Sequence, residues 1–242
     1  MPADTLVLVP TYNEVENLPA ILDRIRAALP DADVLVIDDD SPDGTGRLAD
    51  EHAAADEHVR VLHRTTKEGL GRAYLAGFQR ALDEGYEFVV EIDADGSHDP
   101  ADLPRLLAAA RGGADLVIGS RWIEGGAIRD WAALRQAISR SGNRYARIAL
   151  GSHVHDLTAG FRVFRARVLR SIRLETVASH GYGFQVEMAW RTERAGFTIR
   201  EEPVTFVERV HGTSKMHLGI VLEALWRVTG WGVRARFGRR VS

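Results

Sequence analysis

Short apolar runs alternate with amphipathic helical patterns through the first half of this chain, and each apolar run ends in a polar or acidic loop. Repeated strand–helix units with apolar strands predict a mostly parallel sheet covered by helices on both faces, an α/β fold. The expected strands are Leu6–Pro10, Val34–Asp38, Val59–His63, Phe88–Asp93 and Asp115–Gly119, and the expected helices are Leu18–Leu29, Thr45–Ala55, Leu70–Glu84 and Ala101–Arg111.

The pattern loosens after Ser120. Gly125-Gly126 indicates a mobile loop, followed by expected helices at Ala132–Leu150 and Phe184–Ala195 and an expected strand at Thr198–Phe206. A chain of 242 residues can form one large domain, and an elaborated C-terminal third is the simplest interpretation. There is no cysteine, no signal-peptide pattern and no long uncharged apolar run, so a cytoplasmic protein without a membrane span is expected.

The net charge of −3 hides an asymmetry. Residues 1–110 hold 9 Lys/Arg against 23 Asp/Glu, whereas residues 111–208 hold 15 against 10 and residues 209–242 hold 7 against 1. An acidic half beside a basic half suits a metal site that faces an anion site. Nucleic acid is not an expected partner, because the basic residues are spread among apolar helices and no nucleic-acid-binding motif is visible.

The most informative stretch runs from Phe88 to Asp99, where a buried strand leads into Asp93, Asp95 and Asp99. Carboxylates grouped at the end of a buried strand repel one another unless a cation neutralises them. Mg²⁺ or Mn²⁺ would do so with carboxylate and phosphate oxygens as ligands. The alternative is an Asp-rich loop in which Asp99-Pro100 begins the next helix.

The ends of the first two strands are also polar. Tyr12 and Glu14 follow the first strand, where they could face a base or a sugar, and Asn17 could cap the next helix. The second strand ends in Asp38-Asp39, which could hold a base N–H or a ribose hydroxyl. The sequence contains neither a dinucleotide-binding G-x-G-x-x-G after the first strand nor a P-loop, which disfavours dehydrogenases and P-loop NTPases.

Taken together, these motifs carry a family resemblance that covers about residues 5–220. They are PTYNE, VIDDDSPDGT, GLGRAYLAGF, IDADGSHDP, GSRW, LTAGFRVFR and FVERVHGTSK, in that order. The chain resembles family 2 glycosyltransferases of the GT-A fold and, more closely, the dolichyl- or polyprenol-phosphate mannose synthases. Asp40 departs from the family pattern, which commonly has glycine there.

The resemblance implies transfer of mannose from GDP-mannose to a polyprenyl phosphate, with inversion and with Mg²⁺ or Mn²⁺. It implies a catalytic role for Asp95, Arg121, Arg135 and Arg209, and a metal site at Asp93 and Asp95. The acceptor phosphate would meet Arg121, Arg135 and Ser139. The expected nucleotide-sugar residues are Pro10, Tyr12, Glu14, Ile37, Asp39, Asp93, Ala94, Asp95, Arg121, Arg209 and Lys215.

Some residues and other functions remain open at this point. Asp156, Gln185 and Glu187 could line the site, and His98, His211 and His217 are expected at the polar surface or behind the ligands. A hexosyltransferase that uses a UDP-sugar is the main alternative. A nucleotidyltransferase would need a Gly- and Lys-rich phosphate loop, and a non-catalytic scaffold would leave both acidic clusters unexplained.

The C-terminal segment, residues 216–242, is expected to lie outside a catalytic domain of residues 1–215. Its Trp residues and basic end suit a membrane surface, although Leu218–Leu225 could equally be a helix packed on the core. Gly230 and Gly232 predict that any helix weakens beyond that point, which leaves Trp231–Ser242 for contact with a membrane or partner. Together with Trp122 and Trp131, this tail predicts a peripheral enzyme on the cytoplasmic membrane face, with a separate membrane protein as a possible partner.

Overall fold

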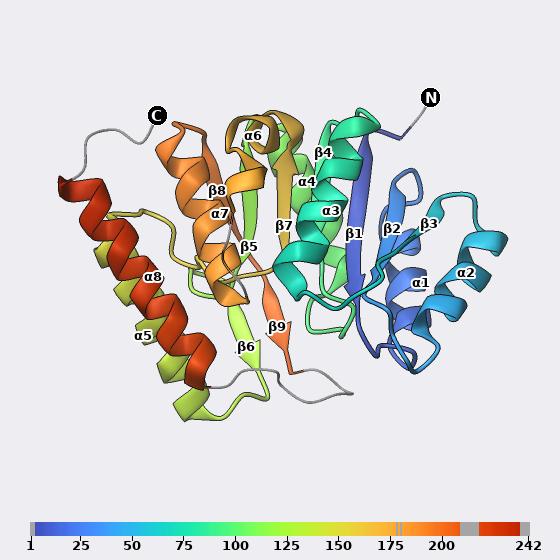
Figure 1. Cartoon of the computed structure of the whole chain (residues 1–242), viewed down its shortest axis with the longest axis horizontal. Coiled ribbons are helices and arrows are strands. Elements are labelled where there is room, and N and C mark those ends of the chain that lie inside the picture. The colour runs from blue at the N-terminus through green and yellow to red at the C-terminus, as the bar shows by residue number, and fades with distance from the viewer. Residues whose placement is uncertain (1–2, 178, 180, 209–217, 238–242) are drawn as a thin grey trace.

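The computed structural model describes residues 3–177, 179, 181–208 and 218–237. A seven-stranded sheet in the order β3-β2-β1-β4-β7-β5-β8 forms its centre, with a separate pair β6-β9 (Figure 1). The strands are β1 (Thr5–Thr11), β2 (Asp33–Asp38), β3 (Val59–His63), β4 (Phe88–Glu91), β5 (Leu116–Ser120), β6 (Ala127–Arg129), β7 (Arg162–Arg165), β8 (Ile199–Pro203) and β9 (Thr205–Val207). The α-helices are α1 (Leu18–Ala28), α2 (Thr45–Ala55), α3 (Leu70–Asp83), α4 (Leu103–Arg111), α5 (Ala133–Leu150), α6 (Ala166–Ser171), α7 (Tyr182–Arg194) and α8 (Leu218–Phe237).

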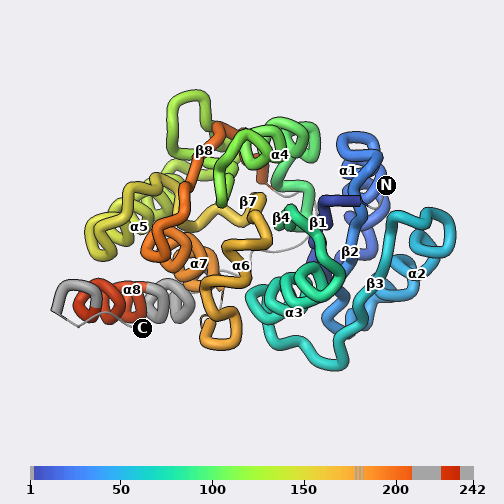
Figure 2. Tube along the Cα trace, turned by 90° about the horizontal axis from the view of Figure 1, so that it is seen from above, coloured from blue at the N-terminus to red at the C-terminus, as the bar shows by residue number. Residues whose placement is uncertain are grey.

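Alternating side chains of β1, β2, β4 and β5 contribute to two hydrophobic cores, one on each face of the sheet. Leu6 and Leu8 of β1 pack with α3, α6 and α7, whereas Val7 and Val9 pack with α1 and α4. Figure 2 shows these two helical layers on opposite sides of the sheet. The α/β fold with a mostly parallel sheet is therefore confirmed, and the covered faces explain the long apolar runs in the central strands β1, β2 and β4.

The sheet is not parallel throughout, because β7 runs antiparallel between β4 and β5. The sequence analysis did not assign β7, since its only apolar residues, Val163 and Phe164, stand between two arginines. The single strand expected at Thr198–Phe206 is also wrong. The chain turns at Val204, so that β8 pairs with β5 and β9 pairs with β6.

The expectation that the terminal helix weakens at Gly230 and Gly232 is wrong, because α8 continues to Phe237. A Cβ on Gly232 would lie 2.2 Å from the Ala149 carbonyl oxygen, so glycine here permits close contact between α8 and α5. Trp231 stacks on Trp190 of α7 with 5.7 Å between ring centroids. The part of the tail that α8 contains therefore packs against the catalytic domain, and no described helix is long and apolar enough to cross a membrane.

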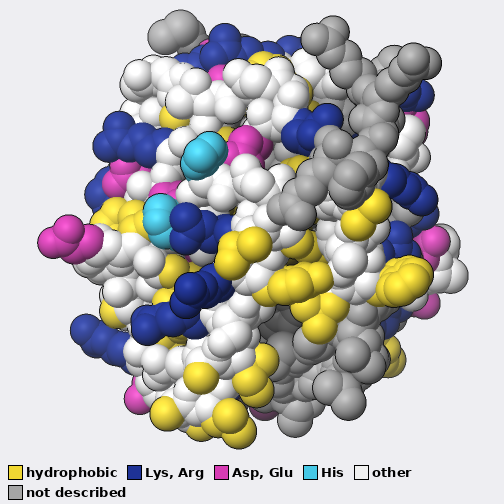
Figure 3. Space-filling model, turned by 90° about the vertical axis from the view of Figure 1, so that its left-hand side faces the viewer, with side chains coloured by type: hydrophobic (Ala, Val, Ile, Leu, Met, Phe, Trp, Pro, Cys, Tyr) yellow, Lys and Arg dark blue, Asp and Glu magenta, His cyan; other side chains and the backbone are white. Residues whose placement is uncertain are grey.

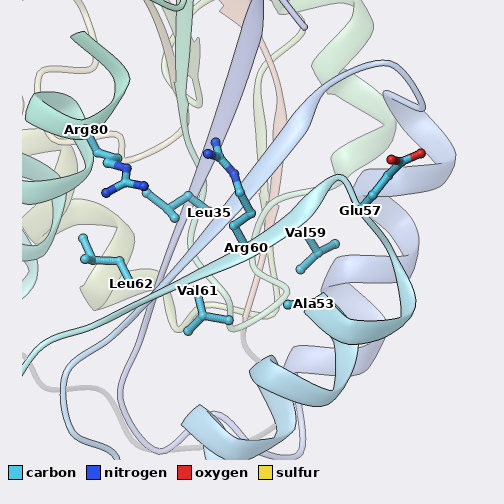
Figure 4. Close-up of a pocket in the computed structure, with 8 residues that line it drawn as sticks. All are labelled: Leu35, Ala53, Glu57, Val59, Arg60, Val61, Leu62 and Arg80. Atoms are coloured by element: carbon cyan, nitrogen blue, oxygen red, sulfur yellow. The ribbon is translucent and has the colours of Figure 1, made fainter. Parts of the chain in front are cut away.

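A depression of about 430 Å³ lies along β3, the edge strand, between Ala53 of α2 and Arg80 of α3 (Figure 4). Its floor follows the side chains of Val59–Leu62 along the strand rather than the loops at the strand's carboxyl end. It is thus separate from the polar loops that the sequence analysis singled out.

Candidate active site

The loops after β1, β2 and β4 meet at one edge of the sheet, because all three strands are parallel. Asp38 accepts hydrogen bonds from the hydroxyls of Thr11, at 3.0 Å, and Ser41, at 2.6 Å. Asp43 accepts from the backbone N–H groups of Val15, at 3.2 Å, and Thr45, at 3.0 Å. Burial opposes ionisation of Asp43, but a hydrogen bond from the Thr45 hydroxyl, at 2.6 Å, and the two backbone hydrogen bonds lower its pKa below the usual value. The aspartates after β2 thus hold the first two loops together.

The expected cap Asn17 does occupy the N-cap position of α1, but its side chain makes no capping hydrogen bond. Its amide instead donates to Glu14 at 2.7 Å. Asp40 adopts a left-handed backbone with φ of 57°, a conformation that glycine reaches without strain. The common glycine of related sequences therefore has a conformational reason.

The loop between β3 and α3 covers two of the expected nucleotide residues. The Arg64 guanidinium donates to Asp39 at 2.5 Å, and the Lys67 ammonium lies 3.5 Å from the centroid of the Tyr12 ring. Burial raises the pKa of Asp39, although the Arg64 guanidinium opposes that shift. This loop can therefore hold Asp39 ready to accept N–H groups of a base.

Asp93 and Asp95 follow β4 and lie at the same edge. Asp93 accepts from the Tyr74 hydroxyl at 3.3 Å, and Asp95 accepts from the Ser97 N–H at 3.0 Å. Asp99 caps the short helical turn at Pro100–Asp102 through the Ala101 N–H at 2.9 Å, so the capping alternative holds for that aspartate alone. Among the described residues no three His, Asp or Glu side chains form a ready metal cluster.

Three of the expected nucleotide-sugar residues have buried apolar side chains. Ile37 faces α3 in one core, Ala94 belongs to the other core, and Pro10 lies within buried β1. Any contact that they make with a ligand must come from their backbone atoms. Their assignment stays a prediction, restricted in this way.

Arg121 is 6% exposed and is held by Asp156, which is fully buried. Its Nε and Nη2 donate to the two Asp156 carboxylate oxygens, each at 2.7 Å, and its backbone N–H donates to the same side chain at 3.0 Å. Burial disfavours the Asp156 carboxylate, but Arg121 outweighs burial and lowers its pKa. The structure thus answers what the sequence left open: Asp156 orients Arg121, whose Nη2 also reaches Thr158 at 3.0 Å.

Arg135, at the start of α5, both stacks on an aromatic ring and forms an ion pair. Its guanidinium lies 3.9 Å from the centroid of the Trp131 indole and forms an ion pair with Glu208. Ser139 is half-buried one turn further along the helix, and its carbonyl accepts from Asn143 at 3.1 Å. Arg209 and Lys215, the remaining expected phosphate residues, lie outside the described residues, as do His211 and His217.

His98 lies between the acidic and basic parts of the site. Of the two expected placements, the polar surface is wrong and a place behind the ligands stays a prediction. The His98 ring is 2% exposed, and its centroid lies 5.0 Å from the ring centroids of both Phe161 and Phe206. Burial lowers its pKa to about 4, so the ring is neutral near pH 7. Its Nδ1 has no hydrogen-bond partner among the described residues.

A second buried pair lies beneath Asp93 and was missed by the sequence analysis. Glu91 of β4 and Arg162 of β7 are cross-strand neighbours, and both are 0% exposed. The Arg162 guanidinium donates to the carbonyls of Ala159 and Leu157, both at 2.8 Å, and of Gln185 at 2.9 Å. Burial raises the pKa of Glu91 to about 8, against the lowering effects of Arg162 and Gln185.

Arg162 therefore holds two segments against β7. One is the loop that carries Asp156, and the other is the first turn of α7. The only signal in the sequence was the arginine within LTAGFRVFR, because a charged residue in a strand pattern is costly to bury. The sequence did not predict its cross-strand neighbour Glu91, because β7 itself was not expected.

Comparisons with known proteins agree with this geometry. Residues 6–173 match the family described as "Glycosyl transferase family 2". The chain is 57% identical over 232 residues to an undecaprenyl-phosphate mannosyltransferase of Micrococcus luteus, covering 96% of this chain and 95% of that protein. It is 52% identical over 236 residues to a polyprenol monophosphomannose synthase of Mycolicibacterium smegmatis, covering 97% and 89%.

Solved structures share the fold at low identity. Mannosyl-3-phosphoglycerate synthase from Rubrobacter xylanophilus matches with a TM-score of 0.68 and 19% identity, covering 98% of this chain and 76% of that one. A mannosyltransferase of Pyrobaculum calidifontis, in complex with GDP-Man and Mn²⁺, matches with a TM-score of 0.58 and 16% identity, covering 99% and 79%. From the family match, the extended relatives and the GT-A architecture, the chain belongs to glycosyl transferase family 2.

Proposed function

We propose that this glycosyltransferase transfers mannose from GDP-mannose to a polyprenyl phosphate, with inversion at the sugar carbon. The observation that carries the proposal is the pairing of an acidic edge, at Asp39, Asp93 and Asp95, with a basic wall at Arg121 and Arg135. Relatives whose names describe mannose transfer to undecaprenyl phosphate or synthesis of polyprenol monophosphomannose extend over nearly the whole chain. The GDP-Man complex of a structural neighbour supports the choice of donor.

The chemistry requires little proton transfer. A phosphate monoester is mostly ionised near neutral pH, since its second pKa lies near 6. One of its oxygens attacks the anomeric carbon, the bond from that carbon to the GDP oxygen breaks, and GDP leaves with the electron pair. Arg121, oriented by Asp156, and Arg135, backed by Trp131, would hold the acceptor oxygens in that position.

A divalent cation fits the donor end of the site. Asp93 and Asp95 supply carboxylate oxygens of the kind that Mg²⁺ and Mn²⁺ prefer, and a diphosphate can complete the ligand set. The buried Ser97 hydroxyl beside them has no partner among the described residues. When bound, the cation stabilises negative charge on the diphosphate.

The direct test is incubation with labelled GDP-mannose and a polyprenyl phosphate, with Mg²⁺ or Mn²⁺, followed by lipid extraction. Labelled UDP-glucose serves as the matched donor control. Lipid-borne label from GDP-mannose alone is expected. Label from UDP-glucose alone would replace this proposal with a polyprenyl-phosphate hexosyltransferase that uses UDP-sugars.

We also propose that the enzyme meets the lipid through an outer face formed by α5 and α8. Arg140 and Arg144 are exposed beside this face. Large hydrophobic side chains stand exposed on the two helices, namely Leu134, Ile138, Tyr145, Ile148, Trp226 and Val233. Figure 3 shows apolar and basic side chains gathered on that side. Such a mixture suits the interface of an anionic bilayer on the cytoplasmic side.

Liposome co-sedimentation tests this face. The double variant Ile148→Ser/Trp226→Ser is expected to bind phosphatidylglycerol vesicles several-fold more weakly than wild type, at unchanged thermal stability, because both side chains are exposed. Equal binding by the two proteins would exclude this face. Binding by neither would favour a separate membrane protein as the partner.

A further inference from the structure

Unsatisfied buried polar groups gather beneath the acidic edge of the site. Within the described part of the chain, the side chains of Glu91, Ser97, His98 and Gln185 all contain buried nitrogen or oxygen atoms without a hydrogen-bond partner. Buried polar groups in folded proteins are almost always paired with protein, water or ligand. A concentration of exceptions next to Asp93 and Asp95 therefore points to a ligand.

Gln185, on α7, is the clearest case. Its side chain is 3% exposed, and neither its amide nitrogen nor its amide oxygen makes a hydrogen bond. The amide interacts with the Glu91 carboxyl below it without meeting hydrogen-bond geometry. The backbone of Gln185 is held in place by Arg162, which donates to its carbonyl at 2.9 Å.

Gly160 marks the space that this amide faces. A Cβ added to Gly160 would lie 3.5 Å from Asp93 Oδ2 and 3.7 Å from Gln185 Nε2. These are ordinary contact distances, and the backbone of Gly160 has no positive φ that would demand glycine. A side chain at position 160 would occupy the space between the Asp93 carboxylate and the Gln185 amide. Glycine is used in proteins where a ligand must approach the backbone closely.

We propose that Gln185 and Gly160 form the subsite for the hexose of the donor, with Asp93 at its edge. A sugar hydroxyl both donates and accepts hydrogen bonds, and a side-chain amide offers one partner of each kind. A neutral amide also suits a neutral sugar, whereas the charged groups of the site face phosphate and metal. This assignment rests on the proposed function and makes Gln185 a specificity-determining residue for the sugar.

The test compares the affinities of GDP and GDP-mannose, both in Mn²⁺ and without acceptor. In Gln185→Leu, GDP-mannose is expected to bind about tenfold or more weakly than to wild type, while GDP binds as before, since a hydrogen-bonding partner of the sugar alone is lost. Gly160→Ala should also weaken GDP-mannose more than GDP, because its methyl group takes up part of the space proposed for the sugar and meets Asp93 only at the ordinary contact distance of 3.5 Å. Gln79→Leu, an exposed glutamine on α3, is the matched control.

The outcomes are distinct. Equal weakening of GDP and GDP-mannose, or no change in either, would overturn the hexose subsite. A wild-type enzyme that binds UDP-glucose but not GDP-mannose would instead contradict the proposed donor, and the same variants would then be tested with UDP and UDP-glucose. Circular dichroism and thermal melting establish that both variants fold.

Discussion

Two groups of residues in the candidate site are built differently: the proposed donor side, formed by Asp38, Asp39, Asp93 and Asp95, and the proposed acceptor side, formed by Arg121 and Arg135. Each donor-side carboxylate lies at, or a few residues after, the carboxyl end of β2 or β4, so the strand pattern places it. On the acceptor side, Arg121 pairs with a residue 35 positions away and Arg135 with one 73 positions away. Local sequence therefore determines the first side, and tertiary folding determines the second.

The same contrast applies to charge. Asp93 accepts a hydrogen bond from a tyrosine hydroxyl, and Asp95 accepts one from a backbone N–H. The carboxylate oxygens of this pair are well suited to bind a cation. Arg121 and Arg135 each already hold a carboxylate, so their orientation is set before a phosphate arrives. Activity should therefore be most sensitive to loss of a metal-binding carboxylate on the donor side. On the acceptor side it should be most sensitive to loss of a contact that orients an arginine.

The largest expected effect is on stability, in Arg162→Met. This change removes hydrogen bonds to three backbone carbonyls of buried residues, which should cost about 3–5 kcal/mol of unfolding free energy. Urea denaturation measures it, with the exposed Arg170→Met as control. A loss below about 1 kcal/mol, as for a surface ion pair, would refute the structural role given to Arg162.

For the donor side, Asp95→Ala should reduce transfer by about 10²-fold or more, since a ligand that positions the diphosphate charge is lost. The fold should survive, because the change also removes negative charge from a crowded edge. Steady-state transfer at saturating Mn²⁺ measures the effect beside Asp23→Ala, an exposed aspartate on α1. Turnover near that of wild type would refute the metal site.

For the acceptor side, Arg135→Ala should raise the KM for polyprenyl phosphate by an amount equivalent to about 1.5–3 kcal/mol, the value of a hydrogen bond to a charged group. The affinity for GDP-mannose should change little. The converse result, a large loss of GDP-mannose affinity at a constant KM for polyprenyl phosphate, would assign Arg135 to the donor side and refute the contrast between the two sides.

His98 lies where the two sides meet and gives a pH dependence. Its pKa falls from 6.5 in the unfolded chain to about 4 in the folded one, so its contribution to stability is present above pH 6.5 and is lost as the pH falls toward 4. Wild type should therefore lose more stability than His98→Gln between pH 6.5 and 4, as measured by chemical denaturation. Parallel curves would show that the ring does not titrate in this way.

The smallest effect is expected at the turn after β2. Asp40→Gly should relieve the left-handed backbone and change stability by less than about 1 kcal/mol, because glycine also loses more entropy on folding. GDP affinity is the sharper measurement, since a negative charge beside the nucleotide loops is removed. A marked fall in GDP affinity would show that Asp40 itself contributes to the donor side.

The βα order, the acidic loops and the family could all be predicted from the sequence, because strands, caps and aspartate loops are local features. It did not reveal β7, the buried Glu91–Arg162 pair or the role of Asp156, which depend on an antiparallel strand inserted from a distant part of the chain. It also misjudged Gly232, whose low helix propensity is outweighed by close packing of α8 on α5. These points depend on tertiary contacts, because each is set by a residue that is distant in the sequence but adjacent in the folded chain.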